Sequence, residues 1–404
     1  MRKIYYYLKL KNTSPIHIGN EENINTDLDI IKNKDGSFFI PGTSLAGSIL
    51  HCLNEQEQEL FNPMKNGKYI QSPIIINDAR MINNDDVEIR NGISLDKNKI
   101  TNHTAKYDYE VIPSNNEFKL CIEITERNGE VYSNLMNKIF SLINNQDIKV
   151  GYKTTRGLGR LHIEKIGRKV FDKNNFKEYF QFDRYNIKNY DNFTIEENNS
   201  EKYIKIKVDL SLRDGISIRT YNNLKDDIDF EHMKSKGKNV IPATSWNGLL
   251  RKSMENYINK LNLDIDIVDI FGNASNDYSK KIKSKIYIDD SIFDKEKNEK
   301  DKKGKEFVFV RNKIDPFYGS ASKGALYKER CYYGGDTELN ISLSKDIKNI
   351  KLVICLLMIT FRDLDYGIIA LGGETAIGRG LFEVKQIYVN DEKKNYSDYM
   401  EVNS

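Results

Sequence analysis

Two short acidic segments hold the residues of this sequence that are best suited to chemistry. They contain two pairs of aspartates, each pair separated by one residue: Asp27 and Asp29, then Asp227 and Asp229. Carboxylates in loops can bind Mg²⁺ through oxygen, or help a ribose hydroxyl to attack its neighbouring phosphate. A loop that needs charge only for solubility has the same composition, so one aspartate alone decides nothing.

Both acidic segments precede the same motif at almost the same distance. Asp27 lies fourteen residues before Pro41 of IPGTSLAG, and Asp227 lies fifteen residues before Pro242 of IPATSWNG. Small hydroxyl residues after a proline are typical of a helix start, where backbone amides and hydroxyls can bind an anion. The predicted donors are Thr43, Ser44, Thr244 and Ser245. Ordinary helix capping would use the same residues, and it is the repetition that favours a function.

A glycine-rich segment closes each half of the chain: GYKTTRGLGR at 151–160 and GGETAIGRG at 372–380. Glycine permits positive φ and close approach of the backbone, so such a loop can lay amides and cations along a phosphate chain. Neither segment has the spacing of a P-loop or a dinucleotide-binding loop. The predicted phosphate-binding residues are Lys153, Arg156, Gly157, Gly159, Arg160, Gly378, Arg379 and Gly380. A glycine turn that serves only tight packing is the alternative.

Histidine and cysteine are too scattered to predict a zinc site or a nucleophile–base arrangement. The four cysteines contain no C-x-x-C pair, and their apolar neighbours predict buried thiols in a reducing cytoplasm. Among the five histidines, His17 borders the turn after the first strand and can face a ligand. His103 and His232 lie in polar segments from which they can assist RNA chemistry.

Length and composition indicate a soluble cytoplasmic protein of two or three domains. The chain has 404 residues, with 62 basic and 59 acidic side chains and a net charge of +3. This balance neither requires nor excludes nucleic acid, so RNA binding would depend on local patches. No apolar run reaches the roughly 18–20 residues of a membrane span, and the N-terminus lacks the pattern of a signal peptide.

Each half is predicted to contain a strand, a helix, further strands, a second helix, the glycine loop and a last strand. This is the β-α-β-β-α-β order of a ferredoxin-like, RRM-like domain, so we expect an α+β protein with two such domains in tandem. We expect the first module over 1–167, a linker over 168–202, the second module over 203–390 and a C-terminal tail over 391–404. Polar excursions from Arg90 to Pro113 and from Arg311 to Tyr333 read as hairpins that can wedge beside bases, or as ordinary surface hairpins.

These segments together resemble the RAMP superfamily of CRISPR effector proteins, in the branch that forms the repeating backbone of type III complexes. The first half matches through HIG, the aspartate before IPGTSLAG, the excursion RNGISLD and the loop GYKTTRGLGRL. The second half matches through Asp227, IPATSWNG, the excursion RNKIDP and the loop GGETAIGRGLF. Two such modules in one chain resemble the fused subunit of type III-D-like complexes.

The resemblance implies a subunit that assembles along a CRISPR guide RNA with other type III effector subunits. A β-hairpin thumb in each module would interrupt the guide–target duplex, and a loop aspartate would support metal-dependent cleavage of the target RNA there. Carried over by motif, the catalytic and metal-binding residues are Asp27 and Asp227, with Mg²⁺ or another divalent cation. Asp29 and Asp229 stay open, because the spacing allows a slip of two residues. The glycine loops and helix starts would hold the guide backbone.

Departures from the family pattern leave other functions open. The second half has Ala243 where the first has Gly42, and Glu374 lies in its glycine loop. A non-catalytic guide-RNA-binding subunit, including the end-capping kind, is therefore the main alternative to the endoribonuclease. A guide-processing endonuclease would need a well-placed general base instead.

Overall fold

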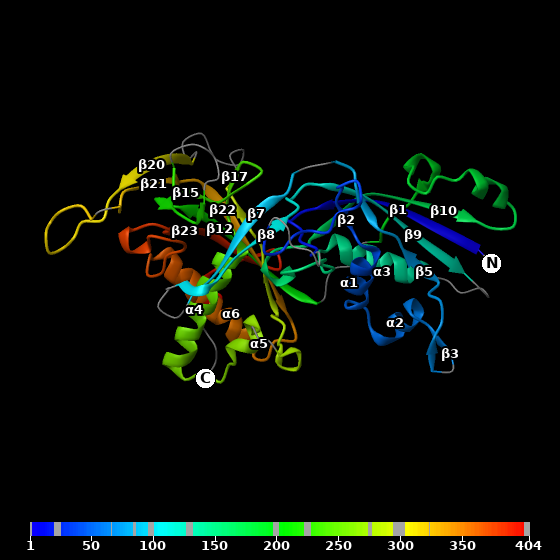
Figure 1. The fold of residues 1–404 in the computed structure, drawn as a ribbon. Helices are drawn as coiled ribbons and strands as arrows, with labels where there is room; N and C mark the ends of the chain where they lie inside the picture. Colours follow the sequence, from blue (N-terminus) through cyan, green and yellow to red (C-terminus); the bar gives the residue numbers. More distant parts are fainter. Residues whose placement is uncertain are drawn as a thin grey trace. The chain divides into compact units, whose positions relative to one another are not determined.

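The computed structural model describes residues 2–19, 26–65, 67–83, 86–95, 101–126, 132–196, 202–221, 228–273, 277–293, 304–322 and 324–399 (Figure 1). It is a mixed α+β fold with several antiparallel sheets, which confirms the predicted class. The chain divides into two compact units. The first comprises Met1–Thr154 and Leu158–Glu201, and the second comprises Thr155–Gly157 and Lys202–Ser404. The predicted module boundaries stay predictions.

The first unit is built around strand β1 (Arg2–Asn12). It pairs with β10 (Leu161–Phe171) on one side and with β9 (Glu117–Glu126) on the other, both antiparallel. The sheet runs β11-β10-β1-β9-β6-β2, and β5 also pairs with β9. The other strands are β2 (Phe39–Ile40), β3 (Met64–Lys65), β4 (Lys68–Tyr69), β5 (Ile74–Ile76), β6 (Ala79–Met81), β7 (Glu88–Leu95), β8 (Thr101–Val111) and β11 (Asp191–Asn192). The helices are α1 (Gly42–Leu50), α2 (Glu55–Phe61) and α3 (Ser133–Asn144).

Both faces of β1 are covered, which explains its long buried run of aromatic and aliphatic residues. Tyr6 and Leu8 belong to the main core, where α3 contributes Phe140. Tyr5 points to the opposite face and packs with aromatic residues that follow β10, including Phe182 at 5.1 Å between ring centroids. The segment after β10 carries the short 3-10 helices η2 (Phe176–Gln181) and η3 (Ile187–Asn189). It therefore supplies a second layer on the sheet.

The second unit is built around β12 (Tyr203–Leu212) in the same way. Its sheet runs β18-β22-β12-β23-β24, and Figure 1 shows the helices α4 and α6 beside it. The strands of this sheet are β18 (Ile286–Ile288), β22 (Asp336–Ser344), β23 (Phe382–Val389) and β24 (Glu392–Lys394). The helices are α4 (Ala243–Leu261), α5 (Ile267–Phe271) and α6 (Ile350–Asp365).

A second sheet in this unit carries a long hairpin. It runs β13-β21-β15-β14, and β20 also pairs with β21, so that β20 and β21 project as an antiparallel hairpin (Figure 1). Its strands are β13 (Gly215–Ile216), β14 (Arg219–Tyr221), β15 (Phe230–His232), β20 (Lys305–Arg311) and β21 (Tyr327–Tyr333). The strands β16 (Lys234–Ser235), β17 (Lys238–Ile241) and β19 (Ser291–Ile292) form a smaller sheet.

The two units repeat one another in fine detail. In each, the first long strand is central and pairs with the last long strand of its unit, β10 or β23. Both pairings contain a register shift, between Lys9 and Leu10 in β1 and between Asp209 and Leu210 in β12. A bulge at the same place, two hundred residues apart, extends the repeat seen in the sequence to the backbone.

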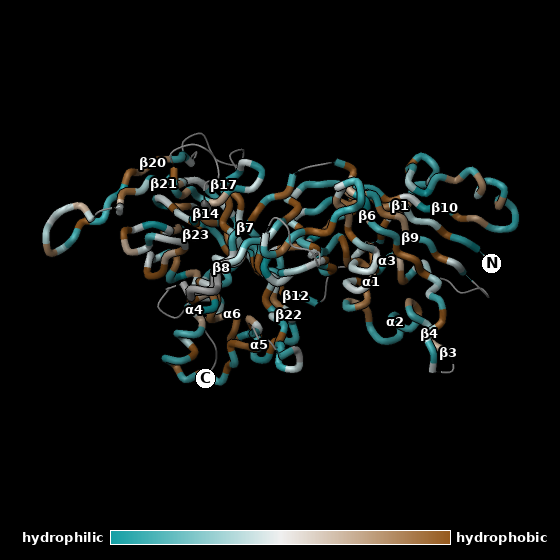
Figure 2. The backbone as a smooth tube through the Cα atoms, viewed as in Figure 1, coloured by the Kyte–Doolittle hydropathy of each residue, from teal (hydrophilic) through white to brown (hydrophobic). Residues whose placement is uncertain are grey.

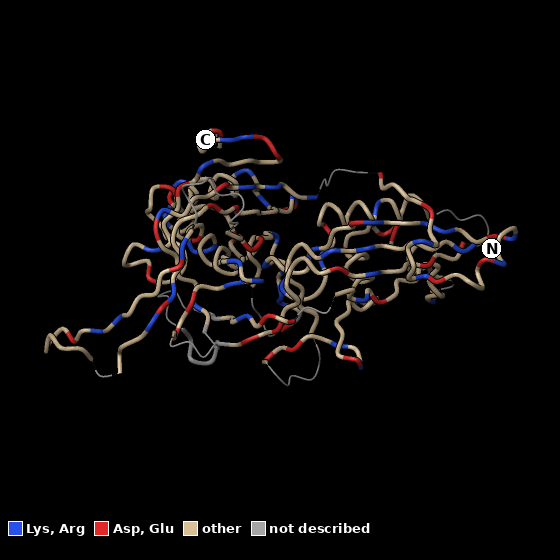
Figure 3. The backbone as a smooth tube through the Cα atoms, turned by 90° about the horizontal axis from the view of Figure 1, so that it is seen from above, with Lys and Arg blue, Asp and Glu red and all other residues tan. Residues whose placement is uncertain are grey.

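Polar and apolar residues are interspersed in both units. Figure 2 shows hydrophobic and hydrophilic segments alternating along the strands and helices of each unit. Figure 3 shows both signs of charge spread over both units, in keeping with the small net charge. No helix in the described part of the chain has the length and apolar character needed to cross a membrane.

The core of the second unit makes a direct stability prediction. Trp246 of α4 is fully buried, and its indole N–H donates to the hydroxyl of Ser291 at 2.9 Å. Trp246→Ala should lower the free energy of unfolding by about 3–5 kcal/mol, because it leaves a cavity and an unsatisfied hydroxyl. Urea unfolding measures this, with Leu261→Ala at the exposed end of α4 as the control. Equal small losses in both variants would contradict the packing described here.

Candidate functional site

Asp27 is tied to the hairpin strand β8 by two hydrogen bonds that run in opposite directions. Its backbone N–H donates to Oδ1 of Asp108 at 2.8 Å, and the backbone N–H of Asp108 donates to Oδ2 of Asp27 at 2.9 Å. The contact continues as a parallel bridge between Leu28 and Tyr109. Asp27 itself is exposed. The acidic loop therefore presents one carboxylate to solvent at a fixed place beside the hairpin.

Asp29 has a different role. It is buried, and its Oδ1 accepts hydrogen bonds from the backbone N–H and the hydroxyl of Thr26, at 2.8 and 2.7 Å. Such bonds close a local turn and stabilise the ionised carboxylate in place. Of the two aspartates left open by the spacing in the first half, Asp27 is thus the one that can reach a ligand.

Asp227 lies outside the described residues, but Asp229 is described and makes the contacts that Asp27 makes. Its backbone N–H donates to the carbonyl of Lys328 at 3.1 Å, and the N–H of Lys328 donates to Oδ2 of Asp229 at 2.8 Å. The next residue, Phe230, pairs in parallel with Glu329. Asp229 is exposed, like Asp27.

A second set of backbone contacts gives the same register. The N–H of Ile31 donates to the carbonyl of Ile18 at 2.9 Å, and Met233 donates to Ile218 at 2.9 Å. Gly19 faces Ile30 in a bridge, as Arg219 faces His232. Both sets align Asp229 with Asp27. Asp229 lies thirteen residues before Pro242 and Asp227 fifteen, so the spacing of fourteen in the first half could not choose between them.

The two glycine loops have the same backbone. Gly159 and Gly380 have φ of +84° and +75°, and their N–H groups donate at 2.8 Å to Pro15 and Gly215 respectively. A Cβ on either glycine would overlap the carbonyl oxygen of Val150 or Leu371. Tight packing therefore accounts for these two predicted glycines, which hold each loop against the first strand's turn.

The side chains of the two loops differ at equivalent positions. Lys153 and Glu374 both adopt left-handed φ, +55° and +56°, one residue after an amide that donates to His17 or Ser217. The Nζ of Lys153 donates to the hydroxyl of Tyr107 at 2.7 Å and lies 3.4 Å from the ring centroid of Tyr109. A cation among aromatic rings in the first unit thus corresponds to a carboxylate in the second.

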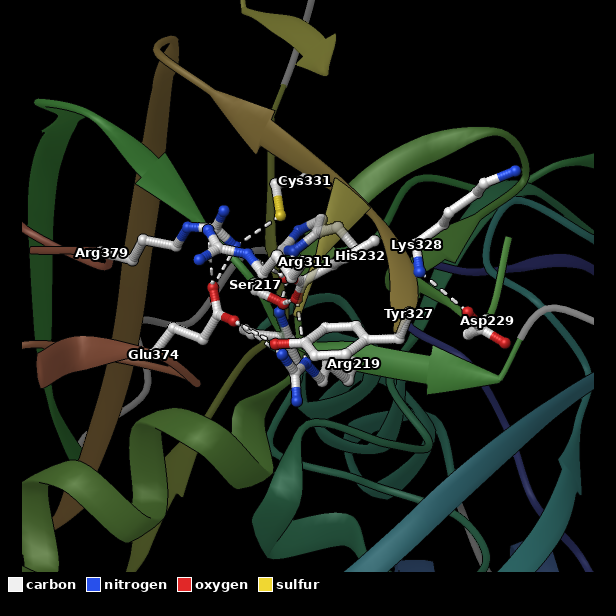
Figure 4. A network of polar contacts seen from close by, with 12 residues as sticks. Ser217, Arg219, Asp229, His232, Arg311, Tyr327, Lys328, Cys331, Glu374 and Arg379 are labelled. Carbon is white, nitrogen blue, oxygen red and sulfur yellow. Dashed lines mark hydrogen bonds and ion pairs between the residues drawn. The ribbon is translucent and has the colours of Figure 1, made fainter. Parts of the chain in front are cut away.

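In the second unit, three arginines converge on two glutamates (Figure 4). Glu329 is fully buried and accepts from Arg219 at 2.9 Å, from Arg379 at 3.0 Å and from the hydroxyl of Ser217. Glu374 pairs with Arg219 at 2.8 Å and with Arg311 at 3.4 Å. Burial alone would raise the pKa of Glu329, but hydrogen bonds and the arginine charges outweigh it and lower the pKa to about 2.

Two of the predicted phosphate-binding cations are turned inward. Arg160 is 6% exposed and donates to Oε1 of Gln146 at 3.0 Å, and Arg379 is 3% exposed within the network around Glu329. This placement favours holding the loops in shape over contact with RNA. Arg156 is exposed and Lys153 is partly exposed, so the prediction of phosphate binding now rests on these two side chains and on the loop backbone.

The helix starts present hydroxyls, but their first amides already have acidic partners. The N–H of Gly42 donates to Asp78, and the N–H of Ala243 donates to Asp290, both at 2.8 Å. Thr43 and Thr244 are exposed, while Ser44 and Ser245 are partly exposed. Neither carboxylate was predicted from the sequence, although each follows a short apolar strand in the same way, IIIND and IYIDD. They would compete with an anion at these helix starts.

Two of the predicted histidines are buried. His17 is 1% exposed, with Nδ1 at 2.7 Å from the carbonyl oxygen of Glu110. His232 is 2% exposed, and its Nδ1 accepts the N–H of Ile218 at 3.1 Å. Burial lowers the pKa of His232 to about 3, so its ring stays neutral near pH 7. The side chain of His103 lies outside the described part of the chain.

The acidic loop of the first unit can be tested for its fit to a divalent cation. Among the described residues no group of three or more histidine, cysteine or acidic side chains could hold a metal ion. Mg²⁺, however, commonly uses one or two carboxylates and takes its other ligands from water and substrate phosphate. Asp27 and Asp108, joined by their reciprocal hydrogen bonds, provide such a donor set.

Comparisons with known proteins point to one family. The sequence profile of the RAMP superfamily matches residues 9–162 and 225–383. No curated protein matches the chain. Among solved structures, the chain is similar to one chain of the cryo-EM structure of the type III-B Cmr-beta bound to cognate target RNA, at 16% identity and a TM-score of 0.35. That match covers 46% of this chain and 61% of the other chain's length.

The buried Glu329 makes a pH-dependent prediction. Its folded pKa lies below the ordinary value near 4.5, so its stabilisation is complete above pH 4.5 and is lost as the pH falls toward 2. Glu329→Gln should cost on the order of 2–3 kcal/mol at pH 7, and less as the pH falls below 4.5. Urea unfolding across this range tests it, with the exposed Glu392→Gln as control. A loss that does not change with pH would contradict the network.

Proposed function

The chain belongs to the RAMP superfamily, and from this premise we propose that it is a backbone subunit of a cytoplasmic type III CRISPR ribonucleoprotein. In this role it binds guide RNA and cleaves the complementary target RNA. One observation carries the proposal: an exposed loop aspartate lies at the base of a projecting hairpin, in the same hydrogen-bond register in both units. The two matched regions favour a fused, two-module subunit of the type III-D-like kind.

The sheet orders support a ferredoxin-like interpretation of each module. The order β10-β1-β9-β5 places the last and third strands on either side of the first, and β23-β12-β22-β18 does the same. Two helices follow the first strand, α1 and α2 or α4 and α5, and one helix, α3 or α6, precedes the last long strand. This order agrees with a β-α-β-β-α-β fold that has an extra short helix and a hairpin inserted between its middle strands.

The hairpins β7–β8 and β20–β21 are the proposed thumbs. Their strands begin at Glu88 and Lys305, earlier than the Arg-Asn pairs that marked them in the sequence. Strand pairing aligns Arg90 with Tyr109 but Arg311 with Tyr327, so the two Arg-Asn pairs are not equivalent positions. In both thumbs, the second strand bonds to the acidic loop and thereby sets the aspartate beside the proposed interruption of the duplex.

Cleavage is assigned to the first module's aspartate. Asp27 and Asp108 would hold a divalent cation, which would polarise the scissile phosphate and stabilise the charge that develops on it. The backbone of β8 keeps Asp27 in place, since the amide of Asp108 occupies one of its oxygens. Held in this way, the aspartate need not reorganise when RNA binds.

Guide binding is assigned to the glycine loops. Arg156 and Gly378 are exposed and Lys153 is partly exposed, so these loop residues are open to a phosphate chain. Binding of this kind follows the phosphate backbone and not the bases, because pairing with the guide supplies sequence specificity. A non-catalytic or end-capping subunit would bind guide RNA in the same way, and only cleavage separates the two functions.

The first test is a substitution at the loop aspartate. In the assembled complex with guide RNA, Asp27→Asn should reduce Mg²⁺-dependent cleavage at one position of the target by at least about 100-fold, because a charged oxygen ligand is lost. Guide binding should not change. Asp35→Asn, in the exposed turn of the same loop region, is the matched control. Unchanged cleavage by the Asp27 variant would favour the non-catalytic alternative.

The second test concerns the guide backbone. Arg156→Ala should weaken binding of unrelated guide sequences to a similar extent, and should reduce the slope of log affinity against log salt by about one. Filter binding over a salt series measures both quantities. Lys348→Ala, an exposed cation elsewhere in the chain, serves as control. An effect confined to one guide sequence would argue against a backbone contact.

A further inference from the structure

The two modules fix their loop aspartates by the same backbone contacts but place different side chains beside them. The register aligns Asp108 of the first module with Lys328 of the second. The N–H of Asp27 donates to the carboxylate of Asp108, whereas the N–H of Asp229 donates to the backbone carbonyl of Lys328. A loop aspartate can therefore be positioned in this fold without a second carboxylate.

Positioning of the loop therefore does not by itself require the carboxylate of Asp108. What it adds is a negative charge beside Asp27, so this pair carries a formal charge of −2. The equivalent pair, Asp229 and Lys328, carries a formal charge of zero. Two like charges in one hydrogen-bonded pair are unfavourable unless a cation neutralises them. The first pair is suited to a divalent cation, and the second pair is not.

At another position the second module has an arginine where the first module has an uncharged residue. Arg219 stands where the first module has Gly19, and it pairs with Glu329 and Glu374. Its guanidinium lies 5.1 Å from the ring centroid of Phe230, the residue next to Asp229. With Arg311 and Arg379 the network has three positive and two negative charges, a net charge of +1. Arg379 is buried in this network, but Arg219 and Arg311 keep part of their side chains exposed. Fixed cations that are open to RNA in this way can neutralise phosphate without a metal ion.

We propose that the modules are specialised: the first cleaves RNA with a divalent cation, and the second binds RNA without cleaving it. The residue at the Asp108/Lys328 position decides which of the two a module does. This inference rests on the proposed function, and it narrows cleavage to the first module. The predicted second cleavage site, at Asp227 or Asp229, is thereby replaced by a binding site.

The test exchanges the two side chains in the full chain, assembled with guide RNA. Asp108→Lys should reduce the first module's cleavage at least about 100-fold, with guide binding retained. Lys328→Asp should create a new product at a second position of the target, and the double variant Lys328→Asp with Asp229→Asn should lose it again. Asp264→Lys and Lys348→Asp, both on exposed side chains, are the charge-matched controls.

A second readout does not depend on cleavage. The full chain without RNA is titrated with Tb³⁺, and the luminescence of the bound ion is measured. Tb³⁺ bound beside Asp108 should be sensitised by the neighbouring Tyr107 and Tyr109. Asp108→Asn keeps an oxygen acceptor for the Asp27 amide but removes the charge, so it should weaken Tb³⁺ binding at least tenfold without disturbing the fold. Lys328→Asp should add a second site, which Tyr327 would sensitise. Mg²⁺ should compete at both.

The outcomes separate the inference from the proposed function. Wild-type cleavage at two positions that Lys328→Asp does not change would overturn the inference and leave the endoribonuclease standing. Tb³⁺ binding that is indifferent to both substitutions would also overturn it. If no variant cleaves RNA, the proposed endoribonuclease fails, and the Tb³⁺ titration alone then decides whether the two modules differ in cation binding.

Discussion

The backbone of one short segment, Pro15–Gly19, holds the functional parts of the first module together. Ile16 exchanges two hydrogen bonds with Ile112 at the end of the hairpin, at 2.9 and 2.8 Å. The carbonyl of His17 accepts the N–H of Tyr152 in the glycine loop, and that of Ile18 accepts the N–H of Ile31 after the acidic loop, both at 2.9 Å. Hairpin, glycine loop and aspartate are therefore fixed to one another by backbone groups, each bond worth about 1 kcal/mol. Residues 215–219 do the same in the second module.

Because these ties run through the backbone, the side chains around them are free to change. The two modules share the bulge in the first strand, the left-handed loop residues and the hydrogen-bond register of the aspartate. Their side chains differ, since Lys153 corresponds to Glu374 and Asp108 corresponds to Lys328. Such exchanges leave the backbone hydrogen bonds of Pro15–Gly19 and of residues 215–219 in place. They change the charge beside the aspartate completely, and this is how two copies of one fold can come to differ in chemistry.

The repeat, the order of elements and the α+β class could be predicted from sequence, because they follow from hydrophobic patterns and turn residues that recur locally. The residue of the second module that is equivalent to Asp27 could not be predicted. The spacing to Pro242 fits Asp227 and Asp229 equally well, and only the hydrogen-bond register identifies Asp229. The burial of Arg160 and Arg379 could not be predicted either, because the sequence of a glycine loop does not show whether its arginine faces solvent or a buried partner. Asp108, eighty-one residues from Asp27, had no local signal that linked the two.

In the proposed mechanism, a divalent cation held by the first module contacts the scissile phosphate. A phosphorothioate target tests this contact: one non-bridging oxygen of that phosphate is replaced by sulfur, at the position whose cleavage requires Asp27, and Mg²⁺ is compared with the more thiophilic Mn²⁺. If the cation makes this contact, one of the two phosphorothioate isomers will be cut poorly in Mg²⁺, and Mn²⁺ will restore its cleavage. Equal cleavage of both isomers in Mg²⁺, at the rate of the unmodified target, would contradict it.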